Sequence, residues 1–478
     1  MASAIVRQFR AVAAPSDLLA VNFPFDPTLG QQQFFANFER FWKLEGTHKP
    51  TLLLRGYAGT GKTTLVGTLV KSLPALKYKA ILLAPTGRAA KVLSSYSGIN
   101  AFTIHKLIYQ PRISKGGGIY FQLQKNFFNR TLFIVDEASM LSDEAEYGQK
   151  SLLEDLVEYV FSHPSNKLML IGDGAQLPPV KKVESPALKQ DYLETSHGLA
   201  VIDTELTEVM RQQQESGILW NATNLRSILF QKEYNIRFRT TAFPDIFKMT
   251  GERLEDGLRY AYDKYGVEDT IIVVRSNKSA VGYNEYIRRT IHYFESELEA
   301  GDMLMIVRNN YFFVPEDSPA GFLANGDFME VMRIVGFEDL HGFRFANLEV
   351  RLLDYPDQEN LSVKVILDTL HSATPNMTRE ENQKLFDSVS QDYLDITNRQ
   401  ERMKAIREDP YLNALQIKFA YALTCHKSQG GQWSAVFVDQ GYLPEEQIDR
   451  EYIRWLYTAT TRAQKELFLV NFHPNFFR

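Results

Sequence analysis

Cysteine is almost absent from this chain of 478 residues, so an internal disulfide bond cannot form. Cys425 is the single cysteine. The nine histidines include no pair at helical metal-ligand spacing, and there is no Cys/His cluster. We therefore expect neither a zinc site nor an oxidising compartment.

Long apolar runs are also missing. No window reaches the roughly 18 consecutive apolar residues that a membrane helix needs. The first residues, MASAIVRQFRAVAAPSDLLAV, lack the basic start and clean apolar stretch of a secretory signal. We therefore expect a cytoplasmic protein without a membrane partner, associated with the nucleoid if the source is bacterial.

The chain has no strong excess of one charge, because 53 Lys and Arg stand against 58 Asp and Glu, a formal charge of −5. This balance argues against a protein that coats nucleic acid, although it allows a local basic groove. A hydrophobic fraction of 44 % is enough for a large core. At about 150 residues per domain, the length predicts roughly three domains.

What the sequence does contain is a regular alternation of apolar runs and helical stretches between residues 51 and 172. This rhythm is typical of a parallel sheet flanked by helices, with its chemistry at the carboxyl ends of the strands. Further apolar runs predict a second core of the same kind. Its expected strands are 269–277, 416–424, 435–439 and 466–470.

Residues 301–370 have a different character, because they are β-rich and broken by turn signals such as Asn325-Gly326. They predict a small β-barrel inserted into the second core. A helix should follow, since Thr378 and Glu381 form a capping box. The apolar stripe of this helix, expected to serve packing, is Leu385, Val389, Tyr393 and Ile396.

The strongest motif is GYAGTGKT, which lies between a predicted strand and a predicted helix. It fills every position of the G-x-x-x-x-G-K-[ST] pattern, whose glycines let backbone N–H groups close around phosphates. Lys62 is expected to reach the β- and γ-phosphate oxygens, and Thr63 is expected to bind Mg²⁺. The residues predicted to bind ATP in this loop are Gly56, Ala58, Gly59, Thr60, Gly61, Lys62, Thr63 and Thr64.

Two acids, Asp136 and Glu137, follow the apolar run LFIV. A P-loop enzyme needs one carboxylate for Mg²⁺ and another for the attacking water at such a position. We assign the metal to Asp136 with Thr63, and the water to Glu137. Gln176 follows the next strand, where its amide either senses the terminal phosphate or only shapes a turn.

With GYAGTGKT, VDEAS and GDGAQLPPV in this order, the chain resembles a superfamily 1 helicase of the RecD/Dda-like branch, which moves 5′ to 3′ on single-stranded DNA. The resemblance implies an α/β fold class with two RecA-like P-loop cores, a β-hairpin pin in the first and a small SH3-like β-barrel in the second. It implies ATP-dependent DNA unwinding, in replication, repair or recombination. ATP and Mg²⁺ are the expected cofactors and single-stranded and forked DNA the expected partners of an active monomer.

Further motifs of this family match between about residues 26 and 471. APTGRAAKVL, FTIHKL and ALTCHKSQGGQW resemble segments that hold the strand. LTEVMRQ and YTATTRAQKELFLV resemble segments that supply arginines to the γ-phosphate, and LGQQQFFA resembles the segment that reads adenine. The resemblance thus predicts Arg211 and Arg462 as catalytic, Gln33 and Gly430 as nucleotide contacts, and Thr86, Arg88, Thr103, His105, Thr424, His426 and Lys427 as DNA contacts.

The insert at residues 109–130 contains four Lys or Arg residues and no acid. Three consecutive glycines at 116–118 can turn a hairpin, and aromatic side chains on it offer faces for base stacking. We interpret it as a strand-separating pin in which Pro111, Tyr120 and Phe121 contact DNA. Of the four aromatic residues that follow the glycines, Tyr120, Phe121, Phe127 and Phe128, two are expected only to pack.

The expected domain boundaries follow from these motifs. They are 1–25 without assignment, 26–205 for the first core with its pin at 109–130, 206–300 and 416–478 for the second core, and 301–415 for the barrel and helical insert.

Two alternative functions stay open. An RNA or RNA–DNA helicase of the same superfamily would share the motifs, since a single sequence does not show whether a 2′-hydroxyl is read. A P-loop switch or scaffold would bind ATP and a protein partner without moving along a strand. Arg462 and the basic insert argue against this second alternative.

Overall fold

The computed structural model describes residues 14–45, 48–113, 119–145, 150–210, 215–314, 322–355, 357–444 and 448–477, without the side chains of 111–113 and 119–121. Its helices are α1 (Pro15–Asn22), α2 (Leu29–Lys43), α3 (Lys62–Ser72), α4 (Gly87–Ser97), α5 (Ile104–Ile108), α6 (Leu152–Phe161), α7 (Gln190–His197), α8 (Gly217–Ile228), α9 (Leu254–Tyr265), α10 (Asn277–Tyr286), α11 (Arg379–Gln391), α12 (Arg399–Arg407), α13 (Cys425–Ser428) and α14 (Arg450–Thr460).

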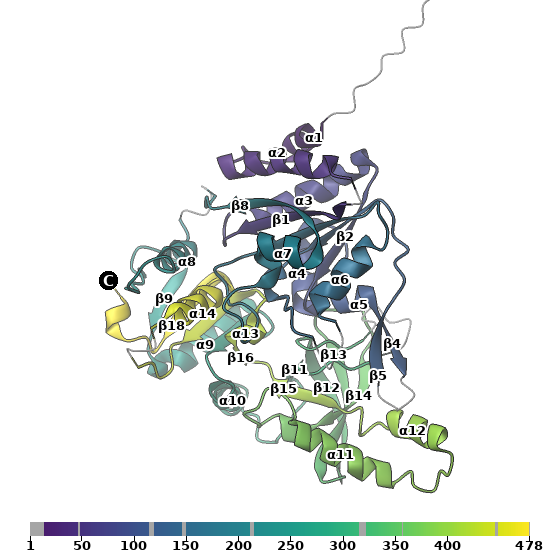
Figure 1. Ribbon diagram of the computed structural model, residues 1–478. Coiled ribbons are helices and arrows are strands. Elements are labelled where there is room, and N and C mark those ends of the chain that lie inside the picture. Colours follow the sequence, from purple (N-terminus) through teal and green to yellow (C-terminus); the bar gives the residue numbers. More distant parts are fainter. Residues whose placement is uncertain are drawn as a thin grey trace, which may run out of the picture.

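The strands belong to two open sheets, one closed barrel and one hairpin (Figure 1). They are β1 (Pro50–Gly56), β2 (Lys79–Ala84), β3 (Ala101–Thr103), β4 (Tyr109–Ile113), β5 (Ile119–Leu123), β6 (Thr131–Val135), β7 (Lys167–Gly172), β8 (Ala200–Leu206), β9 (Ile246–Met249), β10 (Thr270–Val274), β11 (Met303–Ile306), β12 (Phe328–Leu340), β13 (Phe343–Leu352), β14 (Leu361–Ile366), β15 (Leu415–Phe419), β16 (Ala422–Thr424), β17 (Trp433–Asp439) and β18 (Ala463–Val470).

The first core is a parallel sheet with the strand order β3-β2-β6-β7-β1-β8. Strands β6 and β7 are buried at every residue, as expected for a parallel sheet covered on both faces. Leu19 and Phe23 join the same apolar cluster as Phe34 of α2. The described part of the unassigned N-terminal segment therefore packs on this core.

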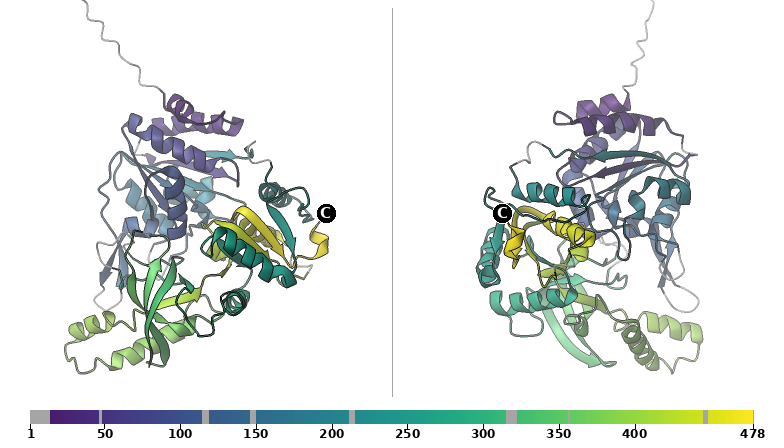
Figure 2. Two further views of the ribbon diagram at one scale, coloured as in Figure 1. Left: turned by 180° about the vertical axis from the view of Figure 1, so that it is seen from behind. Right: turned by 60° about the vertical axis from the view of Figure 1, so that its left-hand side comes forward.

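The second core is also a parallel sheet, in the order β16-β10-β17-β18-β9. It lies beside the first core, and the barrel of β11 to β15 lies below both in the view of Figure 1. Figure 2 shows the same three-part arrangement from two other sides. The predicted fold class, two α/β cores with a hairpin and a small barrel as inserts, is confirmed. No helix in the described ranges is long and apolar enough to cross a membrane.

The run 416–424, predicted as one strand of the second core, is divided between two structures. Leu415–Phe419 forms β15 of the barrel and pairs with β11, whereas Ala422–Thr424 forms β16 beside β10. The Asn284 side chain accepts hydrogen bonds from the backbone N–H groups of Tyr421 and Ala422 at 3.0 and 2.8 Å. At the bend between β15 and β16, the Asn284 side chain thus accepts the backbone hydrogen bonds that a neighbouring strand would otherwise accept.

The helix predicted after the barrel is α11, and its capping box at Thr378 and Glu381 is present. Leu385 and Val389 are buried on it. The helix ends at Gln391, however, so Tyr393 and Ile396 lie beyond the helical stripe in which they were placed. The Tyr393 hydroxyl donates instead to Asp409 at 2.9 Å.

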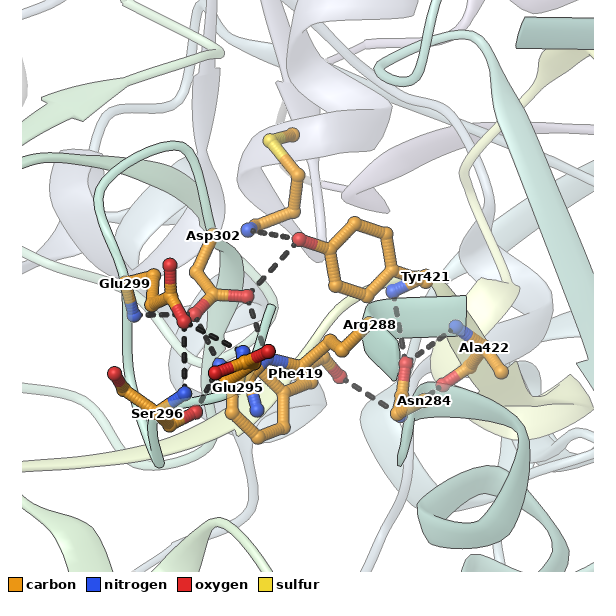
Figure 3. A network of polar contacts seen from close by, with 10 residues as sticks. Asn284, Arg288, Glu295, Ser296, Glu299, Asp302, Phe419, Tyr421 and Ala422 are labelled. Carbon is orange, nitrogen blue, oxygen red and sulfur yellow. Dashed lines mark hydrogen bonds and ion pairs between the residues drawn. The ribbon is translucent and has the colours of Figure 1, made fainter. Parts of the chain in front are cut away.

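A buried polar network joins the barrel to the second core (Figure 3). Arg288 pairs with Asp302 through Nε to Oδ1 at 2.7 Å and Nη2 to Oδ2 at 2.9 Å. The Tyr421 hydroxyl donates to the same Asp302 carboxylate at 3.1 Å. Asn284 donates to the carbonyls of Phe419 and Ala422. Side chains from residues 284–288 thus hold both chain connections between the core and the barrel.

We predict that Asp302→Ala lowers the free energy of unfolding by about 3–5 kcal/mol, because it leaves the Arg288 charge buried without its partner. Asp302 is fully buried and the Arg288 side chain is 5 % exposed. Denaturant unfolding followed by circular dichroism measures the change.

The matched control is Glu349→Ala, which breaks the pair with Arg333, a side chain that is 64 % exposed. Its expected cost is much smaller, because an exposed ion pair contributes little to stability. Equal costs for the two substitutions would contradict a special role for the buried pair.

Candidate ATP and nucleic-acid site

The phosphate loop lies between β1 and α3, as its motif predicted. Gly59 and Gly61 have φ angles of 77° and 85°, a left-handed region that suits glycine. Gly61 is the N-cap of α3 and supplies no side chain to cap it, so the first amides of the helix can serve an anion. The Lys62 ammonium donates to the carbonyls of Gly56 and Tyr57 at 2.7 and 2.9 Å. The loop therefore fits a nucleotide phosphate chain, with Thr63 exposed in the first turn of α3.

The glutamine segment contacts this loop through Gln31 rather than Gln33. Gln31 is fully buried, and its Nε2 donates to the Thr60 carbonyl at 3.3 Å. Gln33 is exposed, and its amide donates to Asn37 of the same helix at 3.2 Å. Thr28 and Gln31 form the capping box of α2, which fixes the register of the three glutamines.

The two acids follow β6 and lie near the loop. Asp136 accepts a hydrogen bond from the Tyr96 hydroxyl at 2.6 Å, and its other oxygen accepts from the Glu137 N–H at 2.8 Å. Glu137 has a φ angle of 52°, which turns its side chain out of the strand direction. Burial raises the pKa of Glu137, while the charges of Arg462 and Lys62 oppose that rise. Glu137 is therefore a stronger base than an exposed glutamate would be.

The second core brings Arg462 to these acids. Arg462 is 2 % exposed, and its guanidinium donates to the carbonyls of Thr458 and Gly431 at 3.1 Å each. Burial raises the pKa of both Glu137 and Asp173, and the positive charge of Arg462 opposes that rise. The guanidinium is thus held in place by backbone oxygens, and its charge favours the ionised form of the acids of the first core.

Gln176 lies at the same junction. It is 7 % exposed, and its Oε1 has no hydrogen-bond partner in the described part of the chain. Beside it, the Leu177 carbonyl accepts from the Gln429 side chain at 2.7 Å, and the Leu177 N–H donates to the Thr458 hydroxyl at 2.9 Å. The loop after β7 therefore connects the first core to two motifs of the second.

Arg211, predicted to contact the γ-phosphate, lies outside the described residues. A different arginine, Arg226 of α8, does reach the loop, with its guanidinium carbon 4.2 Å from the centroid of the Tyr57 ring. The Tyr57 hydroxyl donates to Glu205 at 2.8 Å. Arg226 lies in no segment that matched a motif, so no pattern in the sequence pointed to it.

One of the predicted DNA contacts, Thr86, lies where the two cores face each other. Thr86 caps α4 by accepting from the Ala89 N–H, and Thr103 caps α5 in the same way. Gly430, expected at the nucleotide, instead has Thr86 and Ala89 as its nearest neighbours. The structure thus places Gly430 beside predicted DNA contacts.

Burial favours the uncharged form of three other predicted DNA contacts, His105, His426 and Lys427. Burial lowers the pKa of His105 to about 4 and also lowers the pKa of His426. At neutral pH His105 is therefore uncharged and can offer a strand one N–H donor and one acceptor nitrogen, but no positive charge. Burial and the neighbouring Lys418 lower the pKa of Lys427 to about 8. Thr424 precedes them as the N-cap residue of α13.

Arg88 is not at an open face, contrary to its predicted role as a DNA contact. It is 8 % exposed and lies 3.5 Å from Asp354 of the barrel side. Its guanidinium also stands over the rings of Trp433 and Phe328. These contacts make it a connection between the first core, the barrel and the second core.

A second acid of the barrel, Asp327, lies against the start of α4. It is 1 % exposed, and its Oδ2 accepts from the Ala324 N–H at 2.7 Å. A Cβ atom added to Gly87 would lie 2.2 Å from its Oδ1, so a glycine is needed at that position. Burial and the charge of Asp354 raise the pKa of Asp327 to about 8.

The insert at 109–130 contains the predicted hairpin, formed by antiparallel β4 and β5. Its glycine turn and the side chains of Pro111, Tyr120 and Phe121 lie outside the described residues, so their predicted DNA contacts stay predictions. Phe127 is 80 % exposed, whereas Phe128 packs edge-on against Phe133.

Two sequence families match the chain. One, described as an AAA domain, matches residues 43–227, and the other, a UvrD-like helicase C-terminal domain, matches residues 419–470. Both matches fall on the segments that form the site. Fold and site thus define a helicase-type P-loop ATPase with two α/β cores.

Similar proteins point to a narrower group. The chain is 32 % identical to the ATP-dependent RecD2 DNA helicase of Deinococcus radiodurans over 36 % of its own length and 21 % of that protein. It is 30 % identical to the DNA helicase dda of Enterobacteria phage T4 over 42 % of its length and 43 % of that protein. The resemblance to the RecD/Dda-like branch of superfamily 1 is confirmed.

Longer alignments exist at lower identity. Protein R530 of Acanthamoeba polyphaga mimivirus is 25 % identical over 91 % of this chain and 98 % of its own length. A solved structure of Pif1 helicases unwinding forked DNA aligns over 94 % of this chain and 92 % of its own, at 16 % identity and a TM-score of 0.46.

The raised pKa of Asp327 predicts a pH dependence of stability. The folded chain binds this proton more tightly than the unfolded chain, so the unfolding free energy should fall as pH rises from about 4 to about 8. Asp327→Asn keeps an acceptor for Ala324 and removes the titration, so it should flatten this dependence and stabilise the protein at pH 8. Melting temperatures between pH 5 and 8 measure it.

Asp191→Asn, at an exposed position on α7, is the matched control and should keep the dependence of the unmodified protein. If Asp327→Asn retained the full pH dependence, Asp327 would not be its source.

Proposed function

We propose that this protein is an ATP- and Mg²⁺-dependent DNA helicase that translocates 5′ to 3′ on single-stranded DNA and unwinds forked duplexes. The observation that carries the proposal is the composite site, in which the buried Arg462 of the second core is held by the carbonyls of Thr458 and Gly431. From there its charge opposes the rise that burial causes in the pKa of Glu137 and Asp173 of the first core. The names of the RecD2 and dda relatives support DNA as the substrate. The polarity rests on the resemblance alone.

In this proposal each residue of the site has a distinct task. Lys62 and the loop amides bind the phosphates, while Thr63 and Asp136 would hold Mg²⁺, which would shield the phosphate charge. Glu137 accepts the proton of the attacking water. Arg462 stabilises the charge that spreads over the transferring phosphoryl group, a task that suits its planar and permanent charge.

The DNA path is proposed along the contact between α4 and α13. Thr86 stands at the N-terminus of α4, which favours phosphate, and Thr103 is the N-cap residue of the short helix α5. Lys427 adds a positive charge from the second core. Gly430 lies so close to Thr86 that a Cβ atom added to it would be 3.2 Å from the Thr86 hydroxyl oxygen. A change in the distance between the cores would therefore alter the grip on the strand.

Glu137→Gln should lower kcat for ATP hydrolysis by about 10²- to 10⁴-fold, because the water loses its proton acceptor. Affinity for ATP should stay within a few-fold, since Lys62 and Asp136 are intact. Steady-state hydrolysis and equilibrium binding of a fluorescent ATP analogue measure the two quantities.

Glu194→Gln, an exposed acid on α7, is the matched control and should hydrolyse ATP normally. Loss of ATP binding in Glu137→Gln, with turnover of the bound fraction retained, would refute the assigned role.

The experiment that tests the whole proposal compares DNA substrates. Single-stranded DNA should stimulate the ATPase more than RNA of the same sequence, and binding should weaken as salt rises because phosphate contacts release counterions. A duplex with a 5′ single-stranded tail should be unwound, and one with only a 3′ tail should not. Unwinding from the 3′ tail alone would refute the polarity, and no stimulation by DNA would refute the helicase activity.

A further inference from the structure

A tyrosine of the second core reaches into the phosphate loop. The hydroxyl oxygen of Tyr457, on α14, accepts a hydrogen bond from the Ala58 N–H at 2.9 Å. The same hydroxyl donates to Oδ2 of Asp173 at 2.6 Å. Tyr457 is 1 % exposed and Asp173 is 1 % exposed, so water does not compete for these bonds. One hydroxyl group thus ties together the loop, the end of β7 and helix α14.

The directions of these bonds follow from chemistry. A hydroxyl has one hydrogen to donate and oxygen lone pairs to accept. Burial and the nearby Asp173 charge raise the pKa of Tyr457 well above its ordinary value, so its hydrogen stays in place. Asp173 also accepts from the Ala175 N–H at 2.9 Å. The Ala58 N–H can only donate, and the hydroxyl oxygen of Tyr457 is the atom that accepts its hydrogen bond.

Ala58 belongs to the loop whose amides are expected to surround the phosphates. A backbone amide has a single hydrogen, so a good bond from Ala58 to a phosphate oxygen weakens or breaks its bond to Tyr457. Helix α14 ends at Thr460, two residues before Arg462, and Thr458 on it accepts from the Leu177 N–H. A shift of Tyr457 would therefore act on the helix that leads to the arginine of the site.

We propose that Tyr457 is a positioning residue that competes with the nucleotide phosphates for the Ala58 N–H and thereby couples occupancy of the loop to the position of α14. This inference rests on the proposed ATP site. The competing explanation is that Tyr457 only fills the interface between the cores. The two explanations predict different effects on nucleotide affinity. A competing hydroxyl weakens nucleotide binding, whereas a purely structural contact does not.

The test is the affinity of the full chain for a fluorescent ADP analogue. Tyr457→Phe keeps the ring and removes the competing hydroxyl, so ADP should bind about 2- to 10-fold more tightly, the worth of one ordinary hydrogen bond. The melting temperature should fall slightly, since Asp173 loses a donor. Loss of packing alone would not tighten binding.

The matched control is Tyr452→Phe on the same helix. Tyr452 is 2 % exposed, and its hydroxyl has no hydrogen-bond partner among the described residues. Its ADP affinity should equal that of the unmodified protein. Unchanged or weaker ADP binding in Tyr457→Phe, or equal tightening in the control, would overturn the proposal.

Amide hydrogen exchange of residues 450–460 gives a second readout that does not depend on turnover. In the unmodified protein, addition of ADP should speed amide exchange in this helix. In Tyr457→Phe, exchange should already be faster without ADP, and ADP should change it less. Identical ADP responses in the two proteins would overturn the coupling. Failure of the unmodified protein to bind ADP would refute the ATP site itself, which distinguishes the two conclusions.

Discussion

The site depends on buried charges of opposite sign that come from two separate sheets. Glu137, Asp173 and Lys62 belong to the first core, and Arg462 belongs to the second. Burial alone would drive both acids toward their neutral forms, and the two cations oppose this. Because the second cation arrives from another sheet, the ionisation of the acids depends on how the cores sit together.

The barrel participates in this arrangement because it is fixed on two sides. Arg288 and Asp302 hold it to the second core through a buried pair. On the other side Arg88 of α4 contacts Asp354. A buried pair costs desolvation and contributes little net stability, but losing one partner is expensive, so such pairs favour one geometry over others. The barrel therefore limits the relative positions available to α4 and the second core.

Much of the fold and of the candidate site could be predicted from the sequence, because the patterns that indicate them are local. The phosphate loop, the Asp136-Glu137 pair and the capping box at Thr378 each lie within a few residues of chain. The division of 416–424 could not be predicted, since both halves are apolar and only Asn284, far away in the chain, shows where the direction changes. The register of the three glutamines could not be predicted for a related reason. Identical neighbours look alike in the sequence, and only the capping of α2 by Thr28 shows that Gln31 is the one that contacts the phosphate loop.

The residues that sequence reasoning missed share one property, which is that their partners are distant in the chain. Arg226 meets Tyr57, and Tyr457 meets Ala58 and Asp173, across the junction of the cores. The proposed helicase activity requires contacts of this kind, because ATP hydrolysis at one core would have to change the position of the other. A hydroxyl that bonds a loop amide directly is suited to this task, since a phosphate and the neighbouring core cannot both take the same hydrogen. The coupling would then arise from the limited capacity of one N–H group, without a new conformation of the loop.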